Sequence, residues 1–202
     1  MIAYQPTKAA EYGITFGDQK ENGIFKRMGD SDCTNFISQC IWAGYGGTDG
    51  YSLNRPEDIE HLRERVAQNY RQTWTWFGRH FQSTSNYPSN AFIQVEALWN
   101  YAVYNTGEGP KAKGYNNGKH WSEMKVLVER GDVLQFFQEA MGRYAHSTIV
   151  VSDTHLSIED SIRQAYVAQH SADYSYRPLL SAVMSNDGLE KAKIRILKFQ
   201  PW

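Results

Sequence analysis

The chain has 202 residues, of which 41% are hydrophobic and 21% charged, and its net charge is −1 at pH 7. This composition is that of a folded globular protein and argues against disorder. The absence of a basic excess argues against nucleic acid and anionic lipid as partners. No run approaches the roughly 18 apolar residues of a membrane span, and the length predicts one domain over residues 1–202.

The first half of the chain predicts helices joined by loops. Pro6 opens the first helix, which ends near Gly13 or Gly17. A second helix is expected over 33–43, where Ser31 or Asp32 can cap the start and Gly44 ends it. Further helical patterns cover 56–70 and 90–105, and the loops are expected at 18–32, 44–55, 73–90 and 106–121.

The pattern changes after Val126. Short β-branched or aromatic runs, separated by turn residues, predict strands near 132–137, 146–152, 163–169 and 193–200. Helices that precede strands in this way are typical of an α+β domain, with N-terminal helices packed on an antiparallel sheet.

The two cysteines of the chain, Cys33 and Cys40, lie in the segment DCTNFISQC. Two cysteines do not make a disulfide scaffold, and no Cys/His spacing fits a zinc site. Seven helical positions would separate Cys33 and Cys40 by roughly 10 Å, whereas a disulfide requires Cα atoms within about 7 Å. An internal bridge is therefore not expected. Cys40 continues the apolar face of Phe36, Ile37 and Ile41, which predicts a buried core residue.

Cys33 lies at the first turn of the same helix. Free backbone N–H groups and the positive end of the helix dipole stabilise a thiolate there. The same N–H groups can donate to an oxyanion. The position therefore suits a nucleophile, although a core role for Cys33 stays open on position alone.

The residues around Cys33, and three further segments, add to this interpretation. DCTNFISQCIWAGYGG resembles the signature of the amidase-like domain family, a branch of the papain-like, NlpC/P60-type cysteine hydrolases. KAAEYG is similar to the opening helix of that family, RGDVLQFF with AHSTIVVS to its strand pair, and AYVAQHSADYSYRPL to its closing block. These blocks occur in family order from about residue 6 to 180.

The resemblance implies a papain-like fold and site. Cys33 would be the nucleophile and His146, at the start of a strand, the general base. His170 would orient the imidazole, with Asp173 as the alternative orienting residue. The resemblance does not indicate a second oxyanion donor beyond the Cys33 amide.

The implied reaction is hydrolysis of an amide or peptide bond through a thioester, which requires no metal or organic cofactor. The implied substrates are peptides or peptidoglycan fragments of the bacterial cell wall. A location outside the cell or at its surface follows from the resemblance, although MIAYQPTKAAEYG lacks the features of a secretory signal. Two alternatives stay open: a catalytically inactive module that binds wall peptides or a protein partner, and acyl transfer to an amine. The sequence does not indicate an oligomeric state.

Overall fold

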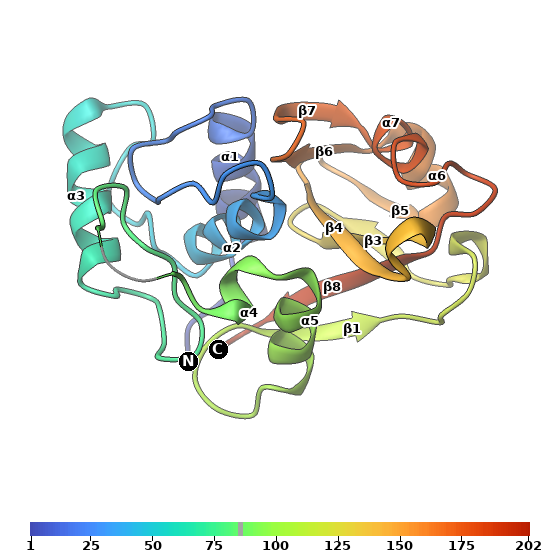
Figure 1. Cartoon of the computed structure of the whole chain (residues 1–202), viewed down its shortest axis with the longest axis horizontal. Helices are drawn as coiled ribbons and strands as arrows, with labels where there is room; N and C mark the ends of the chain where they lie inside the picture. The colour runs from blue at the N-terminus through green and yellow to red at the C-terminus, as the bar shows by residue number, and fades with distance from the viewer. Residues whose placement is uncertain (85–86) are drawn as a thin grey trace.

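The computed structural model describes residues 1–84 and 87–202. Helices and an antiparallel sheet together form the structure, which confirms the predicted α+β class (Figure 1). The main sheet has six strands in the order β1-β8-β3-β4-β6-β7, and every neighbouring pair is antiparallel. A second, two-stranded sheet pairs β2 with β5.

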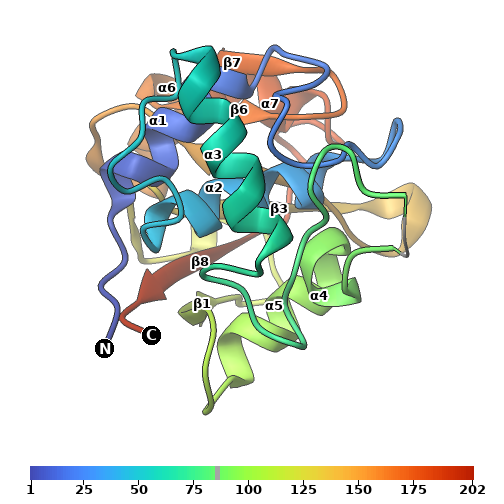
Figure 2. The same cartoon turned by 90° about the vertical axis from the view of Figure 1, so that its left-hand side faces the viewer.

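The N-terminal half supplies most of the helices. They are α1 (Pro6–Phe16), α2 (Cys33–Gly44), α3 (Pro56–Ala67), α4 (Asn90–Ile93) and α5 (Val95–Tyr104). Helices α1 and α2 lie between the sheet and α3, which is outermost in Figure 2. The four predicted helical segments are therefore present, but the last is divided at Gln94, whose backbone is extended. Phe92 of α4 packs against α2, whereas α5 packs against β1 and β8. The two parts of the predicted helix therefore contact different elements.

The C-terminal half carries the sheets. Their strands are β1 (Lys111–Tyr115), β2 (Leu127–Glu129), β3 (Val133–Gln138), β4 (Arg143–Val150), β5 (His155–Ser157), β6 (Tyr166–Gln169), β7 (Tyr174–Pro178) and β8 (Ile194–Gln200). Two helices, α6 (Ile158–Gln164) and α7 (Leu179–Met184), interrupt them, and two short 3-10 turns cover Trp121–Glu123 and Glu139–Met141.

Two segments form a different element from the one that the sequence predicts. Residues 111–115, expected as loop, form β1 because β8 offers them a pairing edge. Residues 163–164, expected in a strand, complete α6, whose start is capped by the Ser157 side chain accepting from the Asp160 amide. The irregular segment expected at 73–90 contains no strand or long helix over its described part, and residues 85–86 lie outside the described residues.

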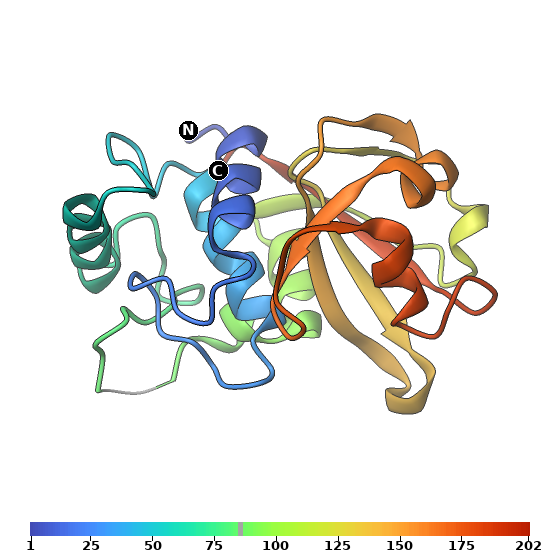
Figure 3. The same cartoon turned by 90° about the horizontal axis from the view of Figure 1, so that it is seen from above.

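Both faces of the sheet are covered. Val133, Ile149 and Leu197 face the core shared with α1, α2 and α5. The alternate residues Leu134, Val150 and Ile196 face α6 and α7. This is the period-two alternation of strands buried on both sides, and Figure 3 shows the helical layer beside the sheet.

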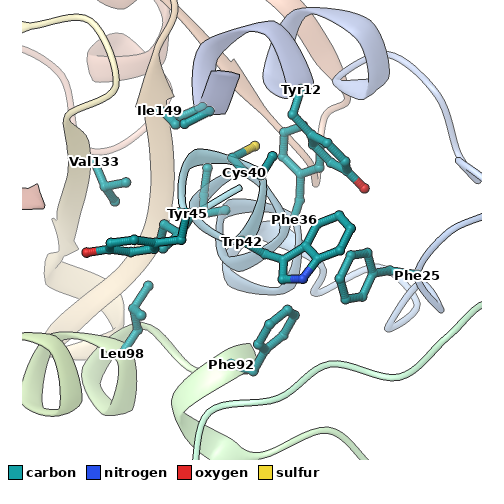
Figure 4. Close-up of a cluster of buried hydrophobic side chains, with 14 of the residues drawn as sticks. Tyr12, Phe25, Phe36, Cys40, Trp42, Tyr45, Phe92, Leu98, Val133 and Ile149 are labelled. Atoms are coloured by element: carbon teal, nitrogen blue, oxygen red, sulfur yellow. The ribbon is translucent and has the colours of Figure 1, made fainter. Parts of the chain in front are cut away.

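Helix α2 runs through the centre of the first core, and all twelve of its residues are buried. Aromatic side chains from α1, α4 and the loop before α2 surround it, as Figure 4 shows for Tyr12, Phe92 and Phe25. Cys40 lies in this core without a disulfide partner, as predicted, and Cys33 is also a free cysteine. A helix buried on all sides has little freedom to shift, so its first residue is held in place.

The two ends of the described chain meet. Ile2 and Trp202 exchange two backbone hydrogen bonds, at 2.7 and 2.9 Å (Figure 1). Among the described helices, none combines the length and the apolar character needed to cross a membrane.

Candidate active site

Cys33 is the first residue of α2, and its side chain keeps 8% of its surface exposed. The preceding residue, Asp32, occupies the N-cap position, but its carboxylate makes no capping hydrogen bond to the helix. The first amides of an α-helix have no carbonyl partner within the helix. The Cys33 amide therefore stays available to an oxygen atom bound beside the sulfur.

Asp32 is fully buried, and its carboxylate turns under the helix start. One oxygen accepts from the Met28 amide at 2.6 Å and from Asn35 Nδ2 at 2.8 Å. The other lies 2.6 Å from His170 Nδ1. These three contacts hold the residue before Cys33 and keep its carboxylate away from the free helix amides.

His170 lies beneath the helix start. Its second nitrogen, Nε2, is 3.1 Å from the Phe16 carbonyl oxygen, and its ring stacks on Phe36 with centroids 3.9 Å apart. Both ring nitrogens thus lie within hydrogen-bond distance of oxygen atoms. The structure therefore joins His170 to Asp32 and gives it no contact with His146.

Asp173, the alternative orienting residue, is also engaged elsewhere. Its Oδ1 accepts from Arg27 at 3.0 Å and from the Ser171 amide at 3.1 Å. Although burial acts to raise it, the Arg27 guanidinium holds the pKa of Asp173 below its ordinary value. The ion pair between Arg27 and Asp173 joins the loop before α2 to the turn between β6 and β7.

His146 lies in β4, next to an irregularity in the pairing with β3. The register shifts between Phe136 and Phe137, so that Ala145 is the extra residue. Such bulges change the direction of neighbouring side chains and are common beside active sites. Tyr144 consequently packs near Cys33, whereas His146 shares the sheet face of Phe136.

The His146 imidazole is neutral near pH 7. Burial lowers its pKa from 6.5 to about 4, Gln169 acts in the opposite direction, and the charge of Arg177 lowers the pKa further. Its Nε2 atom is buried and has no hydrogen-bond partner among the described residues. One of the two nitrogens of a neutral imidazole carries no proton, and that nitrogen is able to accept one.

The sulfur of Cys33 is tied to the strand that carries His146. The backbone of Ser147 is near enough to the sulfur to lower the pKa of the thiol, and Thr34 Oγ1 lies 3.7 Å from the sulfur. Burial nevertheless raises the pKa of the Cys33 thiol. This direction opposes the effect of the helix start, which favours a thiolate, because removal of water disfavours the charged form of the thiol.

A polar network supports Ser147 from within the sheet. Its hydroxyl lies 3.3 Å from Thr34 Oγ1 and accepts from Gln135 Nε2 at 3.3 Å. Gln135 Oε1 accepts from Arg195 at 2.6 Å, and Arg195 also pairs with Glu96 at 2.9 Å. The side chain of Arg195 is almost fully buried, so its charge depends on this one carboxylate.

Cys33 and His146 line one pocket of about 360 Å³. Its walls come from the segment before α2, the tip of the β3–β4 hairpin, the β6–β7 turn and the end of α7. Two other pockets, of about 380 and 530 Å³, lie around Trp74 and around Tyr51, and neither is lined by a cysteine or histidine. The pocket that Cys33 and His146 line is thus smaller than these two.

Gln169, which the sequence analysis did not select, also lines this pocket. Its Nε2 donates to the carbonyls of Ser171 and Ala172, two residues whose positive φ values of 63° and 67° shape the turn. Its side chain lies close enough to His146 to favour the protonated imidazole. The pair is not aligned as a regular hydrogen bond, since Gln169 Oε1 and His146 Nε2 are both buried without a partner.

Strand alternation explains why Gln169, and not His170, reaches His146. Ile149 of β4 pairs with Ala168 of β6, and Val150 pairs with Val167. His146 shares the face of Val150, and Gln169 the face of Val167, whereas His170 follows Ala168 onto the helix side. The alternation of side chains along β4 and β6 could have indicated Gln169, but only with knowledge of the register between the two strands.

Two polar residues of α2 are buried in the core. Gln39 accepts from the hydroxyl of Tyr12 and from Asn22 Nδ2. Ser38 has no hydrogen-bond partner among the described residues. Over residues 1–84 and 87–202, no group of three or more His, Cys, Asp or Glu side chains could hold a metal ion.

Comparison with known proteins gives one match. The family model described as "Putative amidase domain" matches residues 3–196. No curated protein and no solved structure matches the chain. The relation to papain-like NlpC/P60 hydrolases therefore stays a prediction, whereas the resemblance to an amidase domain is confirmed.

Proposed function

The chain belongs to this amidase domain family, and from that premise we propose that it hydrolyses amide bonds through a thioester on Cys33, with His146 as general base. One observation carries the proposal. Cys33 and a buried neutral histidine line the same pocket, and the backbone of Ser147, next to His146, acts on the sulfur so as to lower its pKa. A nucleophile and a base positioned by the same strand meet the first requirement of such catalysis.

The proposed reaction starts from neutral groups. As the Cys33 sulfur attacks the carbonyl carbon, its proton passes to His146, and the Cys33 amide donates to the developing oxyanion. The imidazolium then returns that proton to the leaving amine, and the carbon–nitrogen bond breaks. Water, deprotonated by His146, attacks the thioester, releases the acid and restores the thiol. The balance requires only the substrate and water.

Gln169 takes the orienting role in this proposal. An imidazolium carries protons on both nitrogens, and Oε1 of Gln169 is a buried acceptor without another partner. The Gln169 amide group is anchored in the β6–β7 turn, so a small approach of the ring would complete the bond. His170 has a different part: it holds Asp32, and through it the start of α2.

The substrate class is part of the proposal and rests on the resemblance alone. We propose peptides of the bacterial cell wall, which carries with it a location at the cell surface or outside the cell. The chain would act as a single domain, since the family match extends over most of it. Binding without turnover and transfer to an amine are the competing outcomes.

The test compares the parent protein with Cys33→Ala on digested wall fragments and on plain peptides, with products identified by mass spectrometry. Cys40→Ala is the matched control, because Cys40 is in the same helix but buried in the core. We expect cleavage by the parent and by Cys40→Ala and none by Cys33→Ala. Equal cleavage by Cys33→Ala would remove Cys33 as nucleophile. Fragments retained but uncut by all three proteins would favour the binding module, and an added amine appearing in the product would indicate transfer.

A further inference from the structure

Arg177 is a cation in the wall of the active-site pocket with no acidic partner. It lies in β7, is half-buried, and lines the same pocket as Cys33 and His146. None of the ion pairs among the described residues includes it. The acidic side chain that shares the pocket wall, Asp30, is exposed and not within ion-pair distance.

The guanidinium is held in place by neutral groups. One of its nitrogens donates to the Ser181 carbonyl at 3.0 Å, and the group lies over the Tyr174 ring, 4.7 Å from its centroid. A guanidinium has five N–H donors in a planar fork, so most of them remain for a ligand. Orientation by a ring and a carbonyl reduces the freedom that binding would otherwise remove.

Arg177 is also close to the reacting groups. The side chains of Arg177 and His146 both line the same pocket, and the charge of Arg177 contributes to the low pKa of His146. Apart from the exposed Asp30, the remaining polar lining, including Gln138, Ser185 and Asn186, is uncharged. Arg177 is therefore the positive charge that the pocket lining presents beside Cys33 and His146.

We infer that Arg177 is a specificity-determining residue, which binds a carboxylate carried by the substrate close to the scissile amide. A fork of N–H donors matches the two oxygens of a carboxylate. This inference rests on the proposed function, because it makes the pocket the substrate site. It narrows the substrate class to acyl compounds or peptides with a free carboxylate next to the bond that is cut.

Alkylation of Cys33 tests the inference without requiring turnover. Iodoacetate and iodoacetamide form the same sulfur–carbon bond with loss of iodide, the thiol proton passing to His146 or solvent, but only iodoacetate carries a carboxylate. The rate of each at Cys33 is measured by peptide mass spectrometry at pH 7.5. At that pH His146 is neutral, so an imidazolium does not attract the anion.

We expect the iodoacetate-to-iodoacetamide rate ratio to fall about tenfold in Arg177→Gln, which corresponds to one charge-assisted hydrogen bond, and to be largely kept in Arg177→Lys. Arg163→Gln removes an equal charge from the exposed face of α6 and should leave the ratio unchanged. An equal ratio in the parent and Arg177→Gln, or an equal fall in Arg163→Gln, would overturn the inference.

A second measurement needs only the parent protein. N-acetylglycine should protect Cys33 from iodoacetamide at concentrations where N-acetylglycinamide does not, and equal protection by both would also overturn the inference. The same measurements distinguish failure of the inference from failure of the proposed reaction. If wall peptides and simple amides are not cleaved but Cys33 still prefers iodoacetate, the carboxylate site is supported and the proposed hydrolysis is not.

Discussion

Replacing His146 by Gln should remove a specific pH dependence of stability. In the folded chain, burial lowers the pKa of His146 from 6.5 to about 4. Between these values the unfolded chain binds a proton at this site and the folded chain does not, so stability falls as pH falls. The stabilisation is complete above the unfolded pKa and is lost through the window from 6.5 down to 4.

The size of the effect follows from the two pKa values. At about 1.4 kcal/mol per pKa unit, protonation of the unfolded chain costs the parent about 2 kcal/mol at pH 5 and about 3 kcal/mol at pH 4, relative to pH 7. His146→Gln has no such proton and lacks this loss. Asp132, whose pKa burial raises to about 6, acts in the opposite direction but equally in both proteins, so the difference isolates His146.

The assay is urea unfolding of both proteins at pH 7, 6, 5 and 4, followed by tryptophan fluorescence. His155→Gln is the control at an exposed histidine, whose pair with Glu129 lies at the surface and contributes at most about 1 kcal/mol. Between pH 7 and pH 4, the free energy of unfolding of the parent should fall by about 3 kcal/mol relative to that of His146→Gln. Curves that stay parallel to within about 0.5 kcal/mol would refute the assignment of a buried neutral imidazole.

Three further predictions concern Cys33 itself and the polar groups near Cys33 and His146. Gln169→Leu should lower kcat about 100-fold with little change in KM, because the imidazolium loses its orienting acceptor; an unchanged kcat would contradict this role. Glu96→Gln should lower the free energy of unfolding by about 2 kcal/mol, since Arg195 keeps a buried charge without its carboxylate, whereas Glu139→Gln at an exposed pair should cost under about 1 kcal/mol. Cys33, whose thiol pKa is raised by burial, should show no thiolate absorbance at 240 nm at pH 6 in the unliganded protein, and a thiolate signal there would be contrary to the neutral pair.

Local sequence signals predicted the elements that carry Cys33 and His146, because each element is set by its own segment. A strongly apolar run after Asp32 predicts Cys33 at the first turn of a helix, and β-branched residues after His146 predict a strand. Helix α2 begins where predicted, whereas β4 begins at Arg143, so that His146 lies within the strand and not at its start. The family resemblance, carried mainly by residues 32–39, is likewise local, and the match over 3–196 supports it.

Tertiary structure decided which neighbours these groups meet. Gln169 and His170 are adjacent in sequence, and strand register alone sends one towards His146 and the other under α2, because a shift of one residue exchanges the faces of a strand. The electrostatic environment of Cys33 is also a property of the fold: a helix start favours a thiolate, but burial raises the pKa of the Cys33 thiol. Residues 111–115 show the same dependence, since β8 makes them a strand. Composition and periodicity determine elements and their positions, whereas register, burial and the distribution of charge arise when the elements pack.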